Sequence, residues 1–258
     1  MAASRRTIPL PGGRAAIAAF APPTVSGADA AQALGLSPSR ALLVLNGGTA
    51  ELSPDLSASL RGVLGSGLAR VSIEEELPVV TGGTDAGIFA ILGQALGDER
   101  TAPCVGVVPA GRVVWGQGDS SAEVGSSVEE RVPLEPHHSH FLLVEGDEWG
   151  IETDAMLALC EALSAGVPSL VVLAGGGAGA RREVLAQLHA GREVVALAGT
   201  GRFADTLAGA SAGTAPMGEE TAEMLRDGRV TVVDVGLDPS VLADLLRSRL
   251  VENGGSPR

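Results

Sequence analysis

The sequence predicts an α/β fold, a doubly wound and mostly parallel sheet with helices on both faces. Three observations support this prediction. Short apolar runs alternate with segments of helical periodicity, the runs are continuous rather than alternating, and glycine clusters follow several of them. The whole chain, 1–258, is expected to form one domain, with residues 1–13 and 253–258 frayed.

The expected strands are continuous and rich in β-branched residues, as is typical of strands that are covered on both faces. They are 14–20, 41–45, 77–80, 104–108, 140–145, 169–174, 193–198 and 230–235. Between them, helical spacing predicts helices over 53–69, 151–166, 180–191 and 238–250, and Ser53 and Asp238 are typical capping residues. The segment 112–136 has no clear pattern.

Composition excludes several classes of function. The net charge is −13, which disfavours nucleic acid and anionic membrane surfaces as partners. Every basic residue is arginine, so neither a Walker A lysine nor a Schiff base to a cofactor is available. Cys104 and Cys160 are expected to be free thiols. No apolar run is long enough to span a bilayer, so we expect a cytoplasmic protein without membrane insertion.

Four glycine-rich turns follow predicted strands, at the edge where ligands of such sheets bind. Glycine lets a phosphate approach the backbone, and a following helix offers free N–H groups. Arginine adds a fork of donors for a phosphate. The turns contain the candidate ligand residues Gly47, Gly48, Thr49; Gly82, Gly83, Thr84, Asp85, Gly87; Gly175, Gly176, Gly177, Arg181; and Thr200, Gly201, Arg202.

Four segments in order resemble the SLOG superfamily, a Rossmann-like nucleotide-binding group. They are TGGTDAG, PHHSHFLLVEGDEWGIE, LVVLAGGGAGARREVL and GTGRFADTLAG, and the resemblance covers roughly 40–210. More closely, they resemble the prokaryotic branch related to the cytoplasmic N-terminal region of melastatin-type TRP channels. The resemblance implies a nucleotide sensor, with ADP-ribose or NAD as the kind of ligand, no other cofactor, and self-assembly as in the related region.

Carried over by position, the resemblance implies that the turns 47–49 and 82–87 face the diphosphate or ribose. It implies that Arg202 pairs with a phosphate and that Trp149 stacks on a base. The chain departs from the pattern at Met156, where an ADP-ribose-binding channel has arginine, and at His137, which replaces asparagine. The identity of the nucleotide therefore stays open.

The same superfamily includes enzymes that release the base from nucleoside monophosphates, with the signature P-G-G-x-G-T-x-x-E. Here 175–183 matches the second, third, fifth and ninth positions, and Glu183 would be the catalytic carboxylate. A non-catalytic sensor is the preferred interpretation, and a hydrolase using Glu183 is the alternative. A third interpretation is that the glycine turns are only tight connections.

Several residues also have a purely structural interpretation. His137, His138 and His140 could suggest a metal, but strand alternation would send His137 to the opposite face from the other two, so no metal site is expected. Asp85 favours helix capping, and Glu183 could serve only the dipole of its helix. Trp149 is as well suited to packing as to stacking.

Overall fold

The chain folds around a nine-stranded sheet in the order β1-β2-β8-β5-β4-β3-β9-β10-β11. The structure, a computed structural model, describes residues 4–115 and 131–252. All neighbouring strands are parallel except β1 and β2. The strands are β1 (Ser4–Leu10), β2 (Arg14–Ala21), β3 (Leu42–Gly47), β4 (Val79–Thr81), β5 (Cys104–Pro109), β8 (His140–Val144), β9 (Ser169–Ala174), β10 (Glu193–Ala198) and β11 (Val230–Asp234). The predicted fold class is confirmed.

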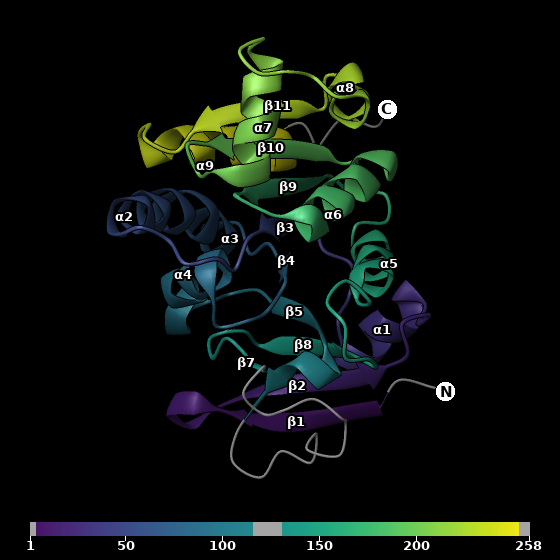
Figure 1. Cartoon of the computed structure of the whole chain (residues 1–258). Helices are drawn as coiled ribbons and strands as arrows, with labels where there is room; N and C mark the ends of the chain where they lie inside the picture. Colours follow the sequence, from purple (N-terminus) through teal and green to yellow (C-terminus); the bar gives the residue numbers. More distant parts are fainter. Residues whose placement is uncertain (1–3, 116–130, 253–258) are drawn as a thin grey trace.

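Helices cover both faces of this sheet (Figure 1). One core cluster lies between the sheet and α2 (Pro54–Gly62), the π-helical turn η2 (Val63–Ala69), α3 (Arg70–Glu74), α4 (Gly87–Leu96) and α9 (Pro239–Arg247). A second lies between the opposite face and α1 (Gly27–Leu34), α5 (Thr153–Leu163), α6 (Ala178–His189), α7 (Arg202–Ser211) and α8 (Glu219–Arg226). The strands of the middle of the sheet are therefore buried on both sides, which explains their unbroken apolar sequences.

Local signals in the sequence account for several helix boundaries. Ser53 accepts a hydrogen bond from the backbone N–H of Leu56 at 3.3 Å, so it caps α2 as predicted. Asp238 caps α9 through the N–H of Ser240 at 2.9 Å. The helix expected over 53–69 is one continuous path but widens into η2, where α9 packs closely over Gly67.

The expectation that residues 1–13 are frayed is wrong for residues 4–13. β1 pairs with β2 along its whole length, from Ser4 opposite Phe20 to Leu10 opposite Arg14. A short turn, η1 (Pro11–Gly13), joins them. Ile8 and Leu10 are buried in a third core cluster beneath β2, β5 and β8. The apolar side chains of this hairpin thus tie the N-terminal segment to the sheet. Residues 1–3 and 253–258 lie outside the described residues.

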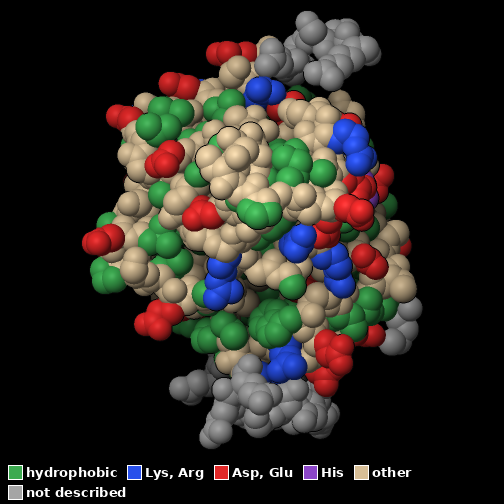
Figure 2. Space-filling view, turned by 45° about the horizontal axis from the view of Figure 1, so that its top comes forward, with side chains coloured by type: hydrophobic (Ala, Val, Ile, Leu, Met, Phe, Trp, Pro, Cys, Tyr) green, Lys and Arg blue, Asp and Glu red, His purple; other side chains and the backbone are tan. Residues whose placement is uncertain are grey.

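The remaining short elements are the turns η3 (Gly97–Glu99), η4 (Ala110–Arg112) and η7 (Ser248–Glu252), and a small sheet of β6 (Val113–Val114) and β7 (Val132–Pro133). Acidic side chains are dispersed over the face seen in Figure 2, in keeping with the net charge of −13. Within 4–115 and 131–252, no helix is both long and apolar enough to cross a membrane.

Candidate functional site

The chain changes direction across the sheet between β3 and β9, which are neighbours. Gly47, the last residue of β3, is in register with Ala174, the last of β9. After β3 the chain passes to the face covered by α2, whereas after β9 it passes to the face covered by α6 (Figure 1). Such a switch point leaves a crevice beyond the carboxyl ends of the strands, where ligands of open α/β sheets bind.

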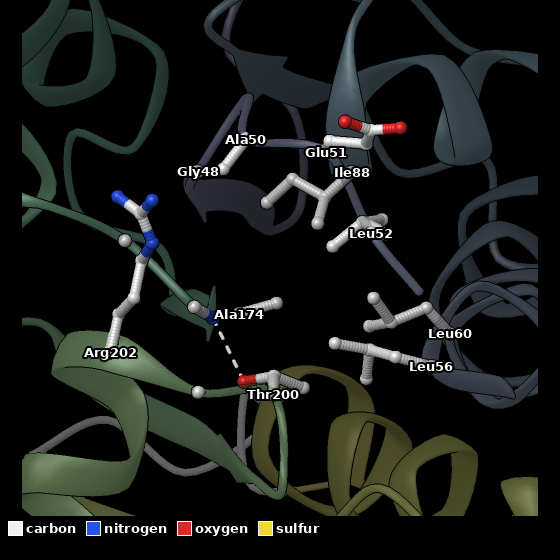
Figure 3. A pocket seen from close by; sticks show the side chains of 13 residues that line it. Gly48, Ala50, Glu51, Leu52, Leu56, Leu60, Ile88, Ala174, Thr200 and Arg202 are labelled. Carbon is white, nitrogen blue, oxygen red and sulfur yellow. Dashed lines mark hydrogen bonds between the residues drawn. The ribbon is translucent and has the colours of Figure 1, made fainter. Parts of the chain in front are cut away.

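A pocket of about 180 Å³ opens at this point (Figure 3). Its walls come from the turn after β3, one face of α2, the start of α4, and the turns after β9 and β10. The predicted ligand residues that line it are Gly48, Gly175, Gly176, Thr200, Gly201 and Arg202. The other lining residues are Ala50, Glu51, Leu52, Leu56, Leu60, Ile88 and Ala174.

The turns after β9 and β10 are joined by hydrogen bonds. Thr200 Oγ1 accepts from the N–H of Gly175 at 2.8 Å and donates to the carbonyl of Leu197 at 2.5 Å. The first amides of α7 are also occupied, because Phe203 and Ala204 donate to the carbonyls of Gly176 and Gly175. Thr200 therefore supports the pocket wall, and the start of α7 offers fewer donors to a ligand than the sequence suggested.

Arg202 is the cation of this pocket. Its φ of 54° lies in the left-handed region, which non-glycine residues rarely adopt. Its side chain is exposed and extends along one side of the pocket (Figure 3). The guanidinium lies near Gly177, which precedes α6 without any side-chain cap. Among the described residues, Arg202 has no side-chain hydrogen bond or ion pair, so its charge and the start of α6 face the same space.

Arg181, by contrast, is turned away from the pocket. Its Nε lies 2.5 Å from Glu220 Oε2, and its guanidinium lies 5.7 Å from the centroid of the Phe203 ring. Glu220 belongs to α8, so this ion pair joins α6 to α8. The two arginines that the sequence offered as equivalent phosphate ligands therefore differ, and only Arg202 lines the pocket.

The glycines of the turn after β4 are required by packing. A Cβ on Gly83 would lie 2.6 Å from the Cα of Gly106 in β5, and one on Gly82 would lie 2.6 Å from the Phe89 ring. Gly87 approaches the backbone at Gly48 and has a φ of 53°. None of these glycines lines the pocket. Their lack of a side chain allows close contact between strands and loops.

The polar residues of the same turn also lie outside the pocket lining. Thr84 is buried and forms a bridge to Leu134. Asp85 is exposed, and its N–H donates to the carbonyl of Pro133 at 2.8 Å. The expectation that Asp85 caps a helix is wrong, because α4 begins after Ala86 and has no side-chain cap. Thr49, after β3, is not among the lining residues either.

A buried carboxylate organises the histidine cluster. Glu135 accepts hydrogen bonds from the backbone N–H of both His137 and His138, and both rings place Nδ1 2.7 Å from its oxygens. His138 Nε2 lies 2.7 Å from Thr81 Oγ1, which accepts from the N–H of Gly83. The cluster thus fixes the turn after β4, and no metal-binding group is found among the described residues.

The electrostatics of this cluster follow from burial and pairing. Burial alone would raise the pKa of Glu135, but the bonds from His138 and His137 hold it below its usual range. Burial would lower the pKa of His138, but Cys104 and Glu135 raise it to about 10. The expected alternation of these histidines is wrong. Residues 135–139 form a turn before β8, so His137 and His138 reach the same carboxylate.

A second polar group lies below the turn after β9, on the α6 side of the sheet. Asn46 Nδ2 donates to Glu183 Oε2 at 2.5 Å. Burial, and after it the negative charge of Glu152, raise the pKa of Glu183 to about 7. Glu152 accepts from the N–H of Gly150 at 2.7 Å, and burial raises its pKa as well. This arrangement can hold a proton on Glu183 near neutral pH, although Glu183 does not line the pocket.

Trp149 lies in the loop between β8 and α5, and half of its side chain is exposed. The neighbouring Gly150 carbonyl accepts from Arg182 Nη2 at 2.5 Å, which holds this loop against α6. Trp149 is not a lining residue of the pocket. The apolar wall there comes instead from leucines that sequence analysis did not select. Their spacing of four residues, at Leu52, Leu56 and Leu60, is the same signal that a core-facing helix gives.

Fold and pocket together define a Rossmann-like α/β protein with a pocket at the switch point of its sheet. Residues 40–248 match the family model described as SLOG in TRPM, prokaryote, and the chain belongs to this family. No curated protein matches. A crystal structure of TM1055 from a structural genomics programme is similar at 17% identity and a TM-score of 0.49, covering 81% of this chain and 99% of that one.

Proposed function

We propose that this protein binds a nucleotide such as ADP-ribose or NAD in the pocket between β3 and β9, and that it acts as a cytoplasmic sensor without turnover. Membership of the SLOG family supports a nucleotide-related role. Arg202 is the observation that carries the proposal. An exposed, conformationally strained arginine beside the uncapped start of α6 has the position and charge that a phosphate ligand requires.

The surrounding geometry is consistent with this role. Gly48 and Gly176 both line the pocket, and a Cβ added to Gly48 would lie 3.2 Å from the backbone N of Gly176. Since both are glycines, the pocket presents bare backbone to a ligand at this point. The bonds from Thr200, Phe203 and Ala204 hold the turn after β9 in place before a ligand binds. Little reordering is then needed on binding, which limits the entropic cost.

Isothermal titration calorimetry with ADP-ribose, NAD, cyclic ADP-ribose, AMP and ATP tests the proposal, with chromatography of each mixture afterwards. We expect saturable binding of at least one of these ligands, recovered intact. Absence of heat from every ligand would refute the nucleotide proposal while leaving the fold unaffected.

A second function is favoured by one observation, the raised pKa of Glu183 near 7 beside Asn46. A carboxyl group that exchanges its proton near neutral pH suits acid–base chemistry, as in release of a base from a nucleoside monophosphate. The position of Glu183 outside the pocket lining favours the sensor. Glu183→Gln separates the two functions: a hydrolase loses product formation, whereas a sensor keeps its affinity and yields no product before or after the change.

A further inference from the structure

The pocket has two chemically different ends. Arg202 extends along one side, and Leu52, Leu56 and Leu60 lie together on the other (Figure 3). Ile88 closes the wall above the leucines. Leu60 and Ile88 are fully buried in the core, but Leu52 and Leu56 are only partly buried. Aliphatic surface therefore remains exposed inside a concave site, where a flat apolar group would cover it.

Polar side chains are scarce in the lining. They are Glu51, Thr200 and Arg202. The Thr200 hydroxyl already donates its proton to a backbone carbonyl and accepts a hydrogen bond from a backbone N–H. It therefore has no proton left to donate to a ligand. That leaves one cation and one carboxylate, and the carboxylate of Glu51 is exposed at the rim. Arg202 can balance the charge of a phosphoryl group, while the additional negative charge of a triphosphate is opposed by the field of Glu51 and of a chain of net charge −13.

From this polarity we infer the class of ligand, on the basis of the proposed nucleotide binding. The pocket selects a nucleotide of low charge, with a phosphoryl group on Arg202 and the base packed on the leucine wall, and it discriminates against a triphosphate. The base is held by aliphatic contact, and Trp149 takes no part in stacking on it. Glu51 is a specificity-determining residue, since its negative charge opposes the additional negative charge of a triphosphate.

The experiment compares AMP, ATP and ribose 5-phosphate by calorimetry on the wild-type chain and on variants. AMP should bind the wild type more tightly than ATP. Leu56→Asn should weaken the affinity for AMP by roughly fivefold or more, because it removes apolar contact with the base. It should change the affinity for ribose 5-phosphate, which has no base, by less than about twofold. Glu51→Gln should raise the affinity for ATP relative to AMP by about two- to fivefold, the size of one exposed charge pair.

Matched controls separate local from general effects. Leu237→Asn makes the same change at an exposed leucine outside the lining and should leave AMP affinity unchanged, as should Trp149→Ala. Should Leu56→Asn unfold the chain, Leu52→Asn makes the equivalent test at a partly exposed position.

The outcomes distinguish this inference from the proposed function. One outcome is that AMP binds and Arg202→Ala weakens its affinity, but Leu56→Asn and Leu52→Asn do not. The phosphate site is then supported, and the packing of the base on the leucines is refuted. Tighter binding of ATP than of AMP overturns the charge argument. Failure of the wild type to bind ADP-ribose, NAD, cyclic ADP-ribose, AMP and ATP rejects the proposed function, and the inference with it. Binding of ADP-ribose or NAD without binding of AMP overturns the inference and leaves the proposed function standing.

Discussion

Replacing Arg202 with glycine should make the protein more stable and a weaker binder. The φ of 54° at Arg202 destabilises the folded state by about 1–2 kcal/mol for a non-glycine residue, and glycine adopts it without this strain. Glycine also gives the unfolded chain about 0.4–1 kcal/mol of additional conformational freedom, which opposes the gain. The free energy of unfolding should therefore rise by roughly 1 kcal/mol or somewhat less.

The affinity should change in the opposite direction. The guanidinium is the only cationic group in the pocket lining, and a hydrogen bond to a charged group contributes about 1.5–3 kcal/mol. Because Arg202 is exposed, the loss should lie towards the lower figure, about tenfold in the dissociation constant for a phosphorylated ligand. Urea denaturation and calorimetric titration of the same preparations measure the two effects.

Two control variants isolate the causes. Arg202→Ala removes the charge but keeps a side chain at the strained position, so it should lose affinity without gaining stability. Glu76, exposed after α3, has a similar φ of 51°, and Glu76→Gly should gain stability without losing affinity. The reasoning is refuted if Arg202→Gly is less stable than Arg202→Ala, or if its affinity for ligand equals that of the wild type.

Three further predictions concern the buried groups and the glycines. The pKa of Glu183 is about 7 in the folded chain and near 4.5 in the unfolded chain, so between these pH values the folded state binds more protons. The free energy of unfolding should therefore fall as the pH rises from 4.5 to 7. Urea denaturation midpoints of Glu183→Gln should lack this decline. Glu135→Gln should cost about 3 kcal/mol or more in urea denaturation, because it leaves buried partners of a carboxylate unmatched; a loss below about 1 kcal/mol would contradict this. Gly83→Ala should lower the thermal midpoint more than Gly166→Ala. Both glycines have a positive φ, but only at Gly83 does a backbone atom lie 2.6 Å from the added Cβ. Equal thermal midpoints would contradict this steric argument.

Every strand of the main sheet except β1 could be predicted from the sequence, because burial on both faces leaves a local signature. The run CVGVV at 104–108, for example, is β5 with one more residue. α1 and α8 were not predicted. α1 is dominated by small alanines and α8 by acidic residues, so each has only one large buried apolar side chain, Leu34 in α1 and Met224 in α8, to mark its apolar face.

The edge of the sheet that carries the pocket could also be predicted, with three of the four turns, but not that the turn after β4 lies outside the pocket lining. Whether a glycine is there for a ligand or for packing depends on what lies opposite, and Gly83 faces Gly106 of another strand. The same limit applies to the arginines. Arg181 and Arg202 follow equivalent turns, yet only the folded chain brings Glu220 to the first of them. The buried position of Glu135 has no local signature for the same reason.

The order of strands also sets the order of folding events. β3 lies in the middle of the sheet, but Leu42 pairs with Ser169, which is 169 − 42 = 127 residues later in the chain. During synthesis at ~5–20 residues per second, β3 therefore waits roughly 6–25 s for this neighbour. β2 waits similarly for β8, since Ile17 pairs with His140. Until residue 174 has emerged the crevice has only one wall, so the pocket can form only after nearly the whole sheet has been made, and such distant pairing favours slow folding.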